Sequence, residues 1–431
     1  MGLRHAHDRR NGVPEPRPRP STGWAGGTLS LLAQPAARHD VCRMRLAFDV
    51  TSCAKSRRGG IATYGWELVR AVARAAPEHE LVLGVRPNRW FKRELLADLV
   101  AELPSNAQLR LLLDRWADGL LRKPDVLHSV GVRLPPRGPG PRSARVVTVH
   151  DVNVFEVPEL SEERWRGERQ ARIRETLARA DLVIAYSEQG RAALAEHVAF
   201  PSDRVRVVPC GVDTAFFARP GEAVLRATLE RHGLLAPDGA SRPYVLLIGE
   251  SSARKNQAGL LAAFARAVTE RALPDEWLLV LAGPRGQAAA ALREVARREG
   301  LPADRMVLPG WVPDADLPAL LAGAALYVCA SLHEGFGLPV LEAQACGAPV
   351  LCSNRGALPE TLGDCGVLFD PADAEAFAAA LIDVLRDAPR RARLAKAGPP
   401  RVAEKFGWAR VAERTLAVHA EAAGSAARGR R

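Results

Sequence analysis

The sequence predicts an α/β fold built from two parallel-sheet domains. The chain has 431 residues, more than one ordinary hydrophobic core supports, so two domains are expected. Apolar runs of strand length alternate with helical patterns in two successive series. Between the series, residues 218–240 carry Pro220, Gly221, Pro237 and Gly239, a composition typical of a linker.

The first series defines a domain over residues 44–217. Its predicted strands cover residues 45–50, 81–85, 125–129, 144–150, 181–186 and 205–208. A predicted helix over 61–75 follows the first strand, and an arginine-rich helix covers 162–180. Because helices alternate with the strands, we expect a parallel, Rossmann-like sheet.

The second series defines a domain over residues 241–400 with the same alternation. Its predicted strands cover residues 244–248, 277–282, 306–308, 325–329, 349–353 and 366–369. An alanine-rich helix is predicted over 374–385, and residues 401–431 form a C-terminal helix with a basic tail. Ligands of such sheets bind at the carboxyl ends of the strands, so the cleft between the domains is the expected active site.

Residues 1–43 differ from the rest of the chain. They are rich in proline and arginine and lack hydrophobic periodicity, so we predict a disordered extension. An alternative is that Met44, which opens the first strand pattern, is the true start. The segment lacks the long apolar stretch of a signal peptide.

The composition, 47% apolar and 25% charged, is typical of a soluble globular protein, and no run of about eighteen apolar residues predicts a membrane span. The seven cysteines form no C-x-x-C pair, which favours reduced thiols in a cytoplasmic protein and argues against zinc. The net charge of +11 fits an anionic substrate or membrane face. Nucleic acid is not an expected partner, because no helix-turn-helix, zinc finger or aromatic-rich basic motif accompanies the charge.

The most informative segment, SLHEGFGLPVLEAQACGAPV, covers residues 331–350. Glu334 is predicted in a loop and Glu342 one turn inside a helix, because Pro339 suits a first helical turn. Four residues of the connecting loop and helix start are candidate donor-binding positions: Gly335, Phe336, Gly337 and Leu338. Bare N–H groups at a helix start suit a diphosphate, and carboxylates accept hydrogen bonds from hydroxyls. The alternative, two solvated glutamates, explains the strand, loop and helix context poorly.

Three further patterns are candidates for the same cleft. Arg254 and Lys255 follow a predicted strand, where paired cations stabilise a leaving diphosphate; an exposed basic loop is the alternative. His150 ends the strand VVTVH and is either a site residue or a structural histidine. Gly60, in a Gly-Gly loop before a helix, allows close approach of a ligand, although a plain turn is common there. The Asp314-Ala315-Asp316 triplet imitates a metal motif but precedes a helix, so we interpret it as a cap and predict no metal site.

The glutamate segment resembles the signature of the retaining nucleotide-sugar glycosyltransferases with the GT-B fold (glycosyl transferases group 1, family 4). In that family the motif is Glu, seven residues, Glu. The resemblance implies that Glu334 contacts the donor sugar and Glu342 the ribose hydroxyls, with Arg254 and Lys255 as the diphosphate clamp. It implies that His150 faces the sugar and the acceptor. Many relatives have Glu-Pro before the clamp, where this chain has Ser252-Ala253.

Smaller segments also match this family: 281–286, 308–317 and 353–360. Backbone near Val312 is expected to meet the base, Gly60 to line the cleft, and residues 354–360 to form a loop beside the donor. The resemblance covers about residues 44–420, with its strongest motifs in the second half. It implies catalysis without a metal or cofactor.

The expected function is retaining transfer of a sugar from a nucleoside-diphosphate sugar to a glycan or lipid-linked acceptor. The Arg-Lys-Asn and His-Asp variants are similar to those of mannosyltransferases that use GDP-mannose in bacterial surface-polysaccharide synthesis. A UDP-sugar donor, a sugar-nucleotide 2-epimerase and a non-catalytic binding protein are the alternatives. The helix over 162–180 is either a solvated surface, since glutamates offset its arginines, or a peripheral contact with an anionic membrane leaflet.

Overall fold

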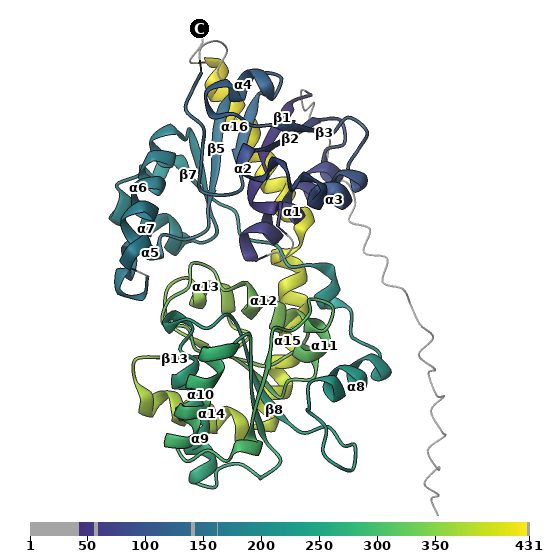
Figure 1. The fold of residues 1–431 in the computed structure, drawn as a ribbon, viewed down its shortest axis with the longest axis vertical. Coiled ribbons are helices and arrows are strands. Elements are labelled where there is room, and N and C mark those ends of the chain that lie inside the picture. Colours follow the sequence, from purple (N-terminus) through teal and green to yellow (C-terminus); the bar gives the residue numbers. More distant parts are fainter. Residues whose placement is uncertain (1–42, 56–58, 139–142, 162, 429–431) are drawn as a thin grey trace, which may run out of the picture. The chain divides into compact units, whose positions relative to one another are not determined.

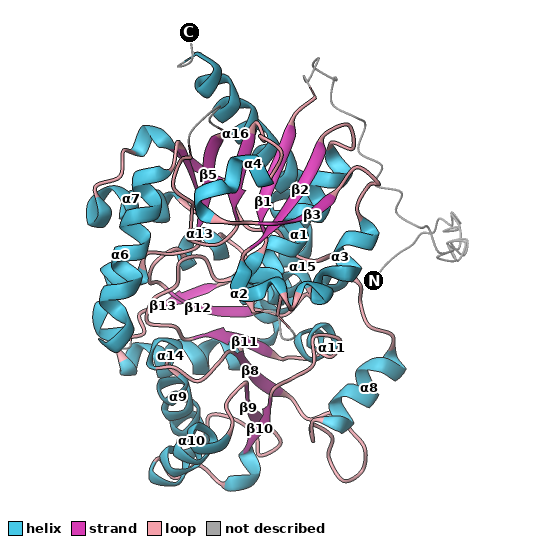
Figure 2. Ribbon diagram, turned by 45° about the horizontal axis from the view of Figure 1, so that its top comes forward, coloured by secondary structure: helices cyan, strands magenta, loops and turns pink. Residues whose placement is uncertain are grey.

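A computed structural model describes residues 43–55, 59–138, 143–161 and 163–428. Apart from Arg43, the predicted disordered extension lies outside these residues. The described chain contains two parallel sheets, each covered by helices (Figures 1 and 2). The predicted α/β architecture is confirmed.

The first sheet has seven strands in the order β3-β2-β1-β4-β5-β6-β7, and the second has six in the order β10-β9-β8-β11-β12-β13. The strands of the first sheet are β1 (Arg45–Asp49), β2 (Glu80–Val85), β3 (Gln108–Leu111), β4 (Val126–Ser129), β5 (Ala144–Val149), β6 (Leu182–Ala185) and β7 (Val205–Val207). Those of the second are β8 (Tyr244–Ile248), β9 (Leu278–Ala282), β10 (Met306–Gly310), β11 (Leu326–Cys329), β12 (Val350–Ser353) and β13 (Val367–Phe369). All neighbouring strands pair in parallel.

Helices connect these strands. In the first half they are α1 (Gly60–Ala75), α2 (Pro87–Trp90), α3 (Ala97–Glu102), α4 (Ala117–Leu120), α5 (Asn153–Glu156), α6 (Glu163–Arg179) and α7 (Glu188–Val198). In the second they are α8 (Glu222–Arg231), α9 (Gln257–Thr269), α10 (Gly286–Arg298), α11 (Leu317–Ala322), α12 (Leu338–Ala345), α13 (Leu358–Leu362), α14 (Ala374–Arg386) and α15 (Ala388–Phe406). Helix α16 (Trp408–Arg428) follows, and a 3-10 turn, η7 (Ala253–Lys255), lies directly after β8.

Both faces of each sheet are buried, which explains the continuous apolar runs of the strands. In the second half, α9, α10 and α14 pack on one face (Figure 2), and α8, α11, α12 and α13 on the other. In the first half, α1, α3 and α16 share one hydrophobic core, whereas α6 and α7 belong to another. The strand ends that carry the candidate site residues are therefore fixed by packed cores on either side.

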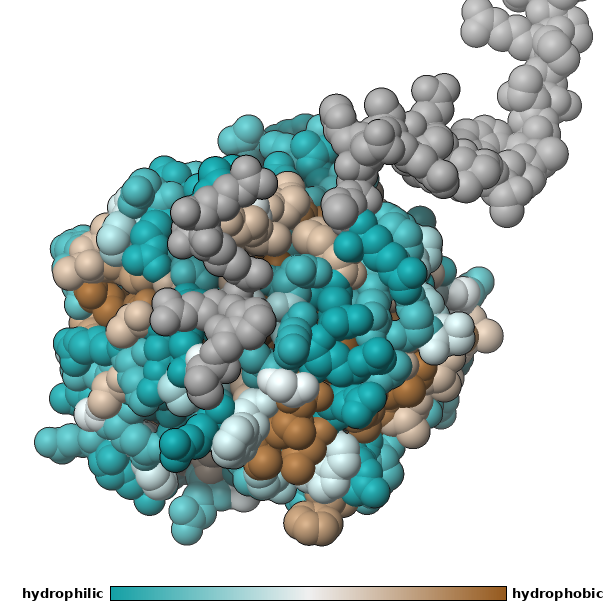
Figure 3. All heavy atoms as spheres, turned by 90° about the horizontal axis from the view of Figure 1, so that it is seen from above, coloured by the Kyte–Doolittle hydropathy of each residue, from teal (hydrophilic) through white to brown (hydrophobic). Residues whose placement is uncertain are grey.

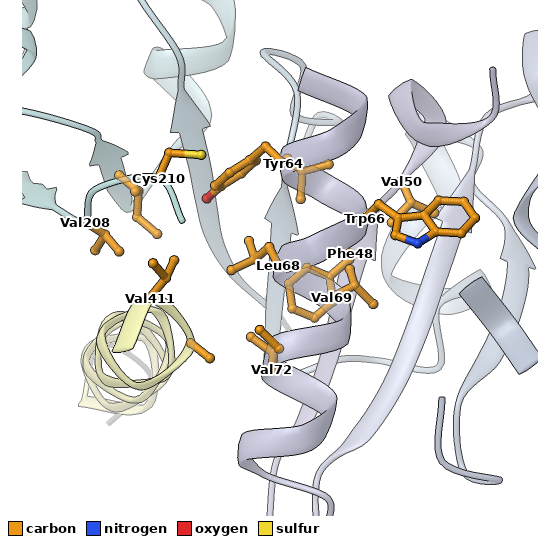
Figure 4. Close-up of a cluster of buried hydrophobic side chains, with 14 of the residues drawn as sticks. Phe48, Val50, Tyr64, Trp66, Leu68, Val69, Val72, Val208, Cys210 and Val411 are labelled. Atoms are coloured by element: carbon orange, nitrogen blue, oxygen red, sulfur yellow. The ribbon is translucent and has the colours of Figure 1, made fainter. Parts of the chain in front are cut away.

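The last helix returns to the first sheet. Val212 pairs with Gly407, and Val212 N donates a hydrogen bond to Phe406 O at 2.9 Å, so the segment that ends the first half lies beside the segment that precedes α16. Beyond Gly407, α16 packs along α1; Figure 4 shows Val411 facing Leu68 and Val72. The core of the first sheet thus includes side chains from the C-terminal helix.

Two sequence expectations need correction. Strand β3 was not predicted, because it is a half-buried edge strand whose short sequence, QLRL, carries a weak apolar signal. The expected linker, 218–240, is not a linker throughout: it contains α8, whose Leu229 is buried in a core of the second half. Glycines in this segment mark the ends of a helix: Gly221 is the N-cap of α8, and Gly233 follows the end of α8 with φ 70°.

Candidate active site

Two cations meet one carboxylate where β8 and β11 end. Lys255 Nζ lies 2.6 Å from Glu334 Oε1, and Arg254 Nη1 lies 2.5 Å from Glu334 Oε2. Ser331 Oγ donates a further hydrogen bond to Glu334 Oε1 at 2.9 Å. The charged side chains are only 11–21% exposed, so one carboxylate offsets the cations in a largely desolvated site.

The two loops that carry these groups also hold each other through their backbones. Leu332 N donates to Arg254 O at 2.8 Å, and Arg254 Nη1 donates to His333 O at 3.0 Å. The cations lie in η7, directly after β8, and Asn256 ends this turn in a left-handed conformation with φ 50°, which asparagine tolerates well. The structure therefore brings together segments that the sequence separates by almost eighty residues.

The pKa of Glu334 is lowered to about 2. Burial alone would raise it, but the charges of Lys255 and Arg254 and the hydrogen bonds from Lys255 and Ser331 outweigh that effect. Glu334 is therefore an anion at neutral pH. A group of this kind orients hydroxyls and balances cations; it does not supply a proton.

Glu342 has a different environment. It lies on α12 and lines a pocket of about 260 Å³, together with Asp213, Asp314 and Leu338. Burial raises the pKa of Glu342 to about 7, helped by the negative charges of Asp314 and Asp213. The two glutamates of the signature segment thus line separate pockets, one anionic and paired with cations, the other close to its titration point.

The connecting loop is shaped by close contacts. A Cβ at Gly335 would lie 2.4 Å from Asp151 Cβ, so only glycine fits against the end of β5. Gly337 is the N-cap of α12 with φ 93°, a conformation that side chains rarely adopt. Pro339 lies in the first turn of α12, as predicted, and Leu338 opens the helix.

Two predicted donor-binding side chains point into protein cores. Phe336 is 8% exposed and packs against Tyr186 and Phe406, and Val312 is 5% exposed in a core of the second half. Only their backbone groups are available to a ligand. Gly60, at the start of α1, is exposed with open space beside it; the neighbouring Arg57 and Arg58 are outside the described residues.

His150 uses both ring nitrogens within the protein. Nε2 lies 2.7 Å from Val130 O, which can only accept, so Nε2 carries the proton and donates. Nδ1 then accepts from Tyr186 Oη at 2.6 Å. Burial lowers the pKa of His150, which keeps the ring neutral. Contact with a sugar would require one of these hydrogen bonds to open.

Comparison with known proteins identifies the family. Residues 58–216 match the model described as Glycosyltransferase Family 4, and residues 238–401 match Glycosyl transferases group 1. The O-antigen chain mannosyltransferase B of Escherichia coli is 32% identical over 375 residues, covering 83% of this chain and 94% of the relative. The chain belongs to the group 1 glycosyltransferases. A D-inositol 3-phosphate glycosyltransferase of Salinispora tropica is also 32% identical, over 84% of this chain and 81% of that protein.

Solved structures show that this glycosyltransferase has the GT-B fold. Anabaena HepE, solved with UDP and glucose, superposes with a TM-score of 0.66 at 18% identity over 88% of this chain and 100% of that one. Sucrose-phosphate synthase from Thermosynechococcus elongatus gives 0.67 at 24% identity, over 88% and 99%. The two parallel sheets described above are the two halves of that fold.

The D-x-D triplet of the glycosyltransferase has a different role from the predicted cap. Asp316 occupies the N-cap of α11, but its carboxylate binds Arg231 Nη1 at 2.5 Å and His232 Nε2 at 3.0 Å and does not bind the helix N–H groups. Asp314 instead lines the pocket of Glu342. Within the described part of the chain, no cluster of three or more His, Cys, Asp or Glu has the geometry to hold a metal ion.

Several site residues were missed from the sequence. Asp213, after β7, lines the pocket of Glu342; the only signal was its position beyond a strand end. Ser331 lies inside the signature segment and was not singled out. Glu360 was expected only as part of a loop beside the donor, yet its carboxylate accepts hydrogen bonds from Glu188 N at 2.9 Å and Gln189 N at 2.7 Å, at the start of α7.

Proposed function

We propose that this glycosyltransferase transfers a hexose from a nucleoside-diphosphate sugar to a hydroxyl of a glycan or lipid-linked acceptor, with retention of configuration. The proposed donor is GDP-mannose and the proposed setting is bacterial surface-polysaccharide synthesis in the cytoplasm. Relatives named as an O-antigen chain mannosyltransferase and serotype-specific mannosyltransferases of Escherichia coli support mannose. The six cysteines in the described residues carry no disulfide, which suits a reducing compartment.

One observation carries the proposal: Arg254 and Lys255 converge on a single point beside Glu334. A diphosphate leaving group needs positive charge at its oxygens as the glycosidic bond breaks. When the donor binds, its phosphate oxygens share these cations with Glu334, which remains to accept a hydrogen bond from a sugar hydroxyl. The eight-residue helix α12 points its N-terminus into the same region and adds partial positive charge.

The proposed reaction uses no protein nucleophile. The acceptor hydroxyl oxygen forms a bond to the anomeric carbon as the bond from that carbon to the phosphate oxygen breaks. The electron pair of that bond stays on the diphosphate, and the hydroxyl proton passes to the departing phosphate oxygen. Because the nucleophile approaches on the face that the diphosphate leaves, configuration is retained. We propose that Arg254 and Lys255 do the work that a metal performs in other transferases, so none is needed.

Glu342 is the proposed contact of the donor ribose. Its pocket is lined by Asp213 and Asp314, whose carboxylates favour hydrogen-bond donors over further anions. With a pKa of about 7, Glu342 exchanges between donor and acceptor states near neutral pH. Hydroxyl groups satisfy both states, since each hydroxyl donates and accepts.

Helix α6 is the proposed point of contact with an anionic membrane carrying a lipid-linked acceptor. Trp165 on this helix is 44% exposed, but Arg172 pairs with Glu168 and Arg179 with Glu175, which reduces the free positive charge. On the face shown in Figure 3, hydrophilic residues predominate and apolar residues form small separate groups. Among the described residues, no helix has the length and hydrophobicity needed to cross a bilayer. Sedimentation with liposomes that shows no dependence on anionic lipid would refute the contact.

The deciding experiment is a thermal-shift panel of GDP-, UDP-, ADP- and dTDP-sugars, followed by a transfer assay with the donor that binds. A ligand of the native state raises the melting temperature according to its affinity. GDP-mannose is expected to give the largest shift and to yield an α-linked product with a glycan acceptor. If a UDP-sugar gives the largest shift, it would replace GDP-mannose as the proposed donor. Release of a free epimerised sugar would indicate an epimerase, and binding without any turnover a non-catalytic protein.

A further inference from the structure

A contact between the two halves lies next to the cation clamp. His333 Nε2 lies 3.4 Å from Glu156 Oε1, and the two side chains are 9% and 10% exposed. Glu156 ends α5 in the first half, whereas His333 directly precedes Glu334 in the second. The separation is within ion-pair range but longer than the usual hydrogen bond of about 2.9–3.0 Å, so closer approach of the halves would strengthen the contact.

Glu156 is the one polar partner of the His333 ring among the described residues. The other ring nitrogen, Nδ1, is buried without a hydrogen bond in that part of the chain. The side chain of His333 is therefore held, as far as polar contacts go, by the opposite half of the molecule. The orientation of its loop depends on where Glu156 lies.

The backbone of His333 is tied to the clamp. Its carbonyl oxygen accepts from Arg254 Nη1 at 3.0 Å, and the preceding Leu332 N donates to Arg254 O at 2.8 Å. A displacement of His333 thus moves the guanidinium that contacts Glu334 Oε2. A two-bond path leads from a carboxylate of the first half to the proposed diphosphate clamp.

A second hydrogen bond reaches the same carboxylate oxygen of Glu156 that faces His333. Gln189 Nε2 donates to Glu156 Oε1 at 2.6 Å, while Gln189 N donates to Glu360 Oε1 at 2.7 Å. Gln189, near the start of α7, thereby links a carboxylate of the first half to one of the second. Glu156 Oε1 thus has one partner from each half of the chain, Gln189 and His333, which suits a role in alignment.

We infer that Glu156 and His333 are a positioning pair: they set the Arg254 and Lys255 clamp in register when the first half closes on the donor-bound second half. This inference rests on the proposed function. Neither residue touches the donor in this role. Loss of the pair leaves the clamp present but misplaced, so turnover falls while the second half still binds donor.

Kinetics of four variants test the inference. Glu156→Ala, His333→Ala and the double variant are each expected to lower kcat roughly 10-fold with little change in donor Kd, and the double variant is expected to resemble the single ones, because both members act through one contact. His333→Gln, which keeps a hydrogen-bond donor, is expected to recover part of the loss. Glu159→Ala is the matched control, since Glu159 is an exposed glutamate three residues from Glu156. Unchanged kcat, multiplying effects in the double variant, or an equal loss of donor affinity would overturn the inference.

Hydrogen exchange of the Leu332 amide provides a readout that needs no turnover. This N–H is bonded to Arg254 O in the second half, yet the inference predicts that Glu156→Ala, in the first half, speeds its exchange roughly 10-fold. Glu159→Ala is expected to leave the exchange rate of this amide unchanged. Equal exchange rates of the Leu332 amide in the wild type and both variants would refute the coupling between Glu156 and the Arg254 loop, whether or not the protein turns over a donor. Absence of transfer by the wild-type protein with normal coupling would instead refute the proposed function.

Discussion

Gly335 lies directly against Asp151: a Cβ at position 335 would be 2.4 Å from Asp151 Cβ and 2.8 Å from His150 O. The backbone oxygen cannot move aside cheaply, so Gly335→Ala is expected to separate the signature loop from the end of β5. We predict a fall of about 1–3 kcal/mol in the free energy of unfolding. We also predict a fall in kcat that, expressed as an activation free energy, exceeds this loss of stability. Urea unfolding and steady-state kinetics measure the two effects. Gly167→Ala on α6, where a Cβ meets nothing within 4 Å, is the control and should stabilise the helix.

Removal of one clamp cation separates catalysis from folding. Lys255→Ala leaves Glu334 paired with Arg254, so the fold is expected to persist while kcat drops by roughly 10²–10³, the cost of losing one group that stabilises a developing anion. Steady-state kinetics with the donor chosen by thermal shift, alongside a melting curve, check this. Lys396→Ala changes an exposed lysine on α15 and should have wild-type kinetics. A Lys255→Ala enzyme with wild-type kcat would contradict the proposed role.

Glu342 makes stability depend on pH. Its pKa of about 7 in the folded state lies above the ordinary glutamate value of 4.5, so between these values the folded state holds a proton that the unfolded chain releases. The stabilisation associated with this proton is complete below about pH 4.5 and is lost as pH rises through 7. Glu342→Gln is therefore expected to raise the melting temperature at pH 8–9. The corresponding gain in the free energy of unfolding is on the order of 1–3 kcal/mol, and no gain is expected at pH 4.5. Melting curves across this range, with exposed Glu404→Gln as control, test it; a gain that is constant with pH would contradict the shift.

His419 is expected to sensitise the first half to acid. It is fully buried on α16, with Nε2 3.0 Å from His128 Nδ1, and burial lowers its pKa to about 3. Stability from the neutral ring is present above the unfolded pKa of 6.5 and is lost as pH falls toward 3, at up to about 1.4 kcal/mol per pH unit.

His419→Asn should accordingly be less stable than wild type at pH 7.5 and should lose less on going to pH 5. Urea unfolding at the two pH values measures the difference. The matched change His197→Asn alters a more exposed histidine on α7 and is expected to keep the wild-type dependence. If the wild type and His419→Asn lose the same free energy of unfolding between pH 7.5 and pH 5, another group controls the response to acid.

The strands were predictable because both faces of each sheet are buried, so their apolar runs are continuous. That rule fails at the edge: β3 is half-exposed and its pattern, QLRL, does not stand out. The same limit applies to turn residues. Gly221 and Gly233 mark the ends of α8, and a local signal for a turn cannot tell a helix boundary from a linker.

The proximity of Arg254, Lys255 and Glu334 was predictable because all three lie at strand ends, where the functional groups of parallel sheets gather. Their mutual ion pairs were not, since those depend on how two loops fold against each other. Glu156 gave no signal in the sequence, as its partner lies in the other half of the chain. The state of His150 likewise depends on Val130 and Tyr186, which only the fold brings to it.

The return of α16 to the first sheet has a consequence for how the protein is made. Its side chains Val411, Ala412 and Val418 belong to the same core as β1 and α1. During synthesis, residues 44–217 leave the ribosome long before residues 408–428, so the N-terminal half emerges first but cannot complete its core first. The C-terminal half has its cores available earlier, and we expect the order of folding to be the reverse of the order of translation.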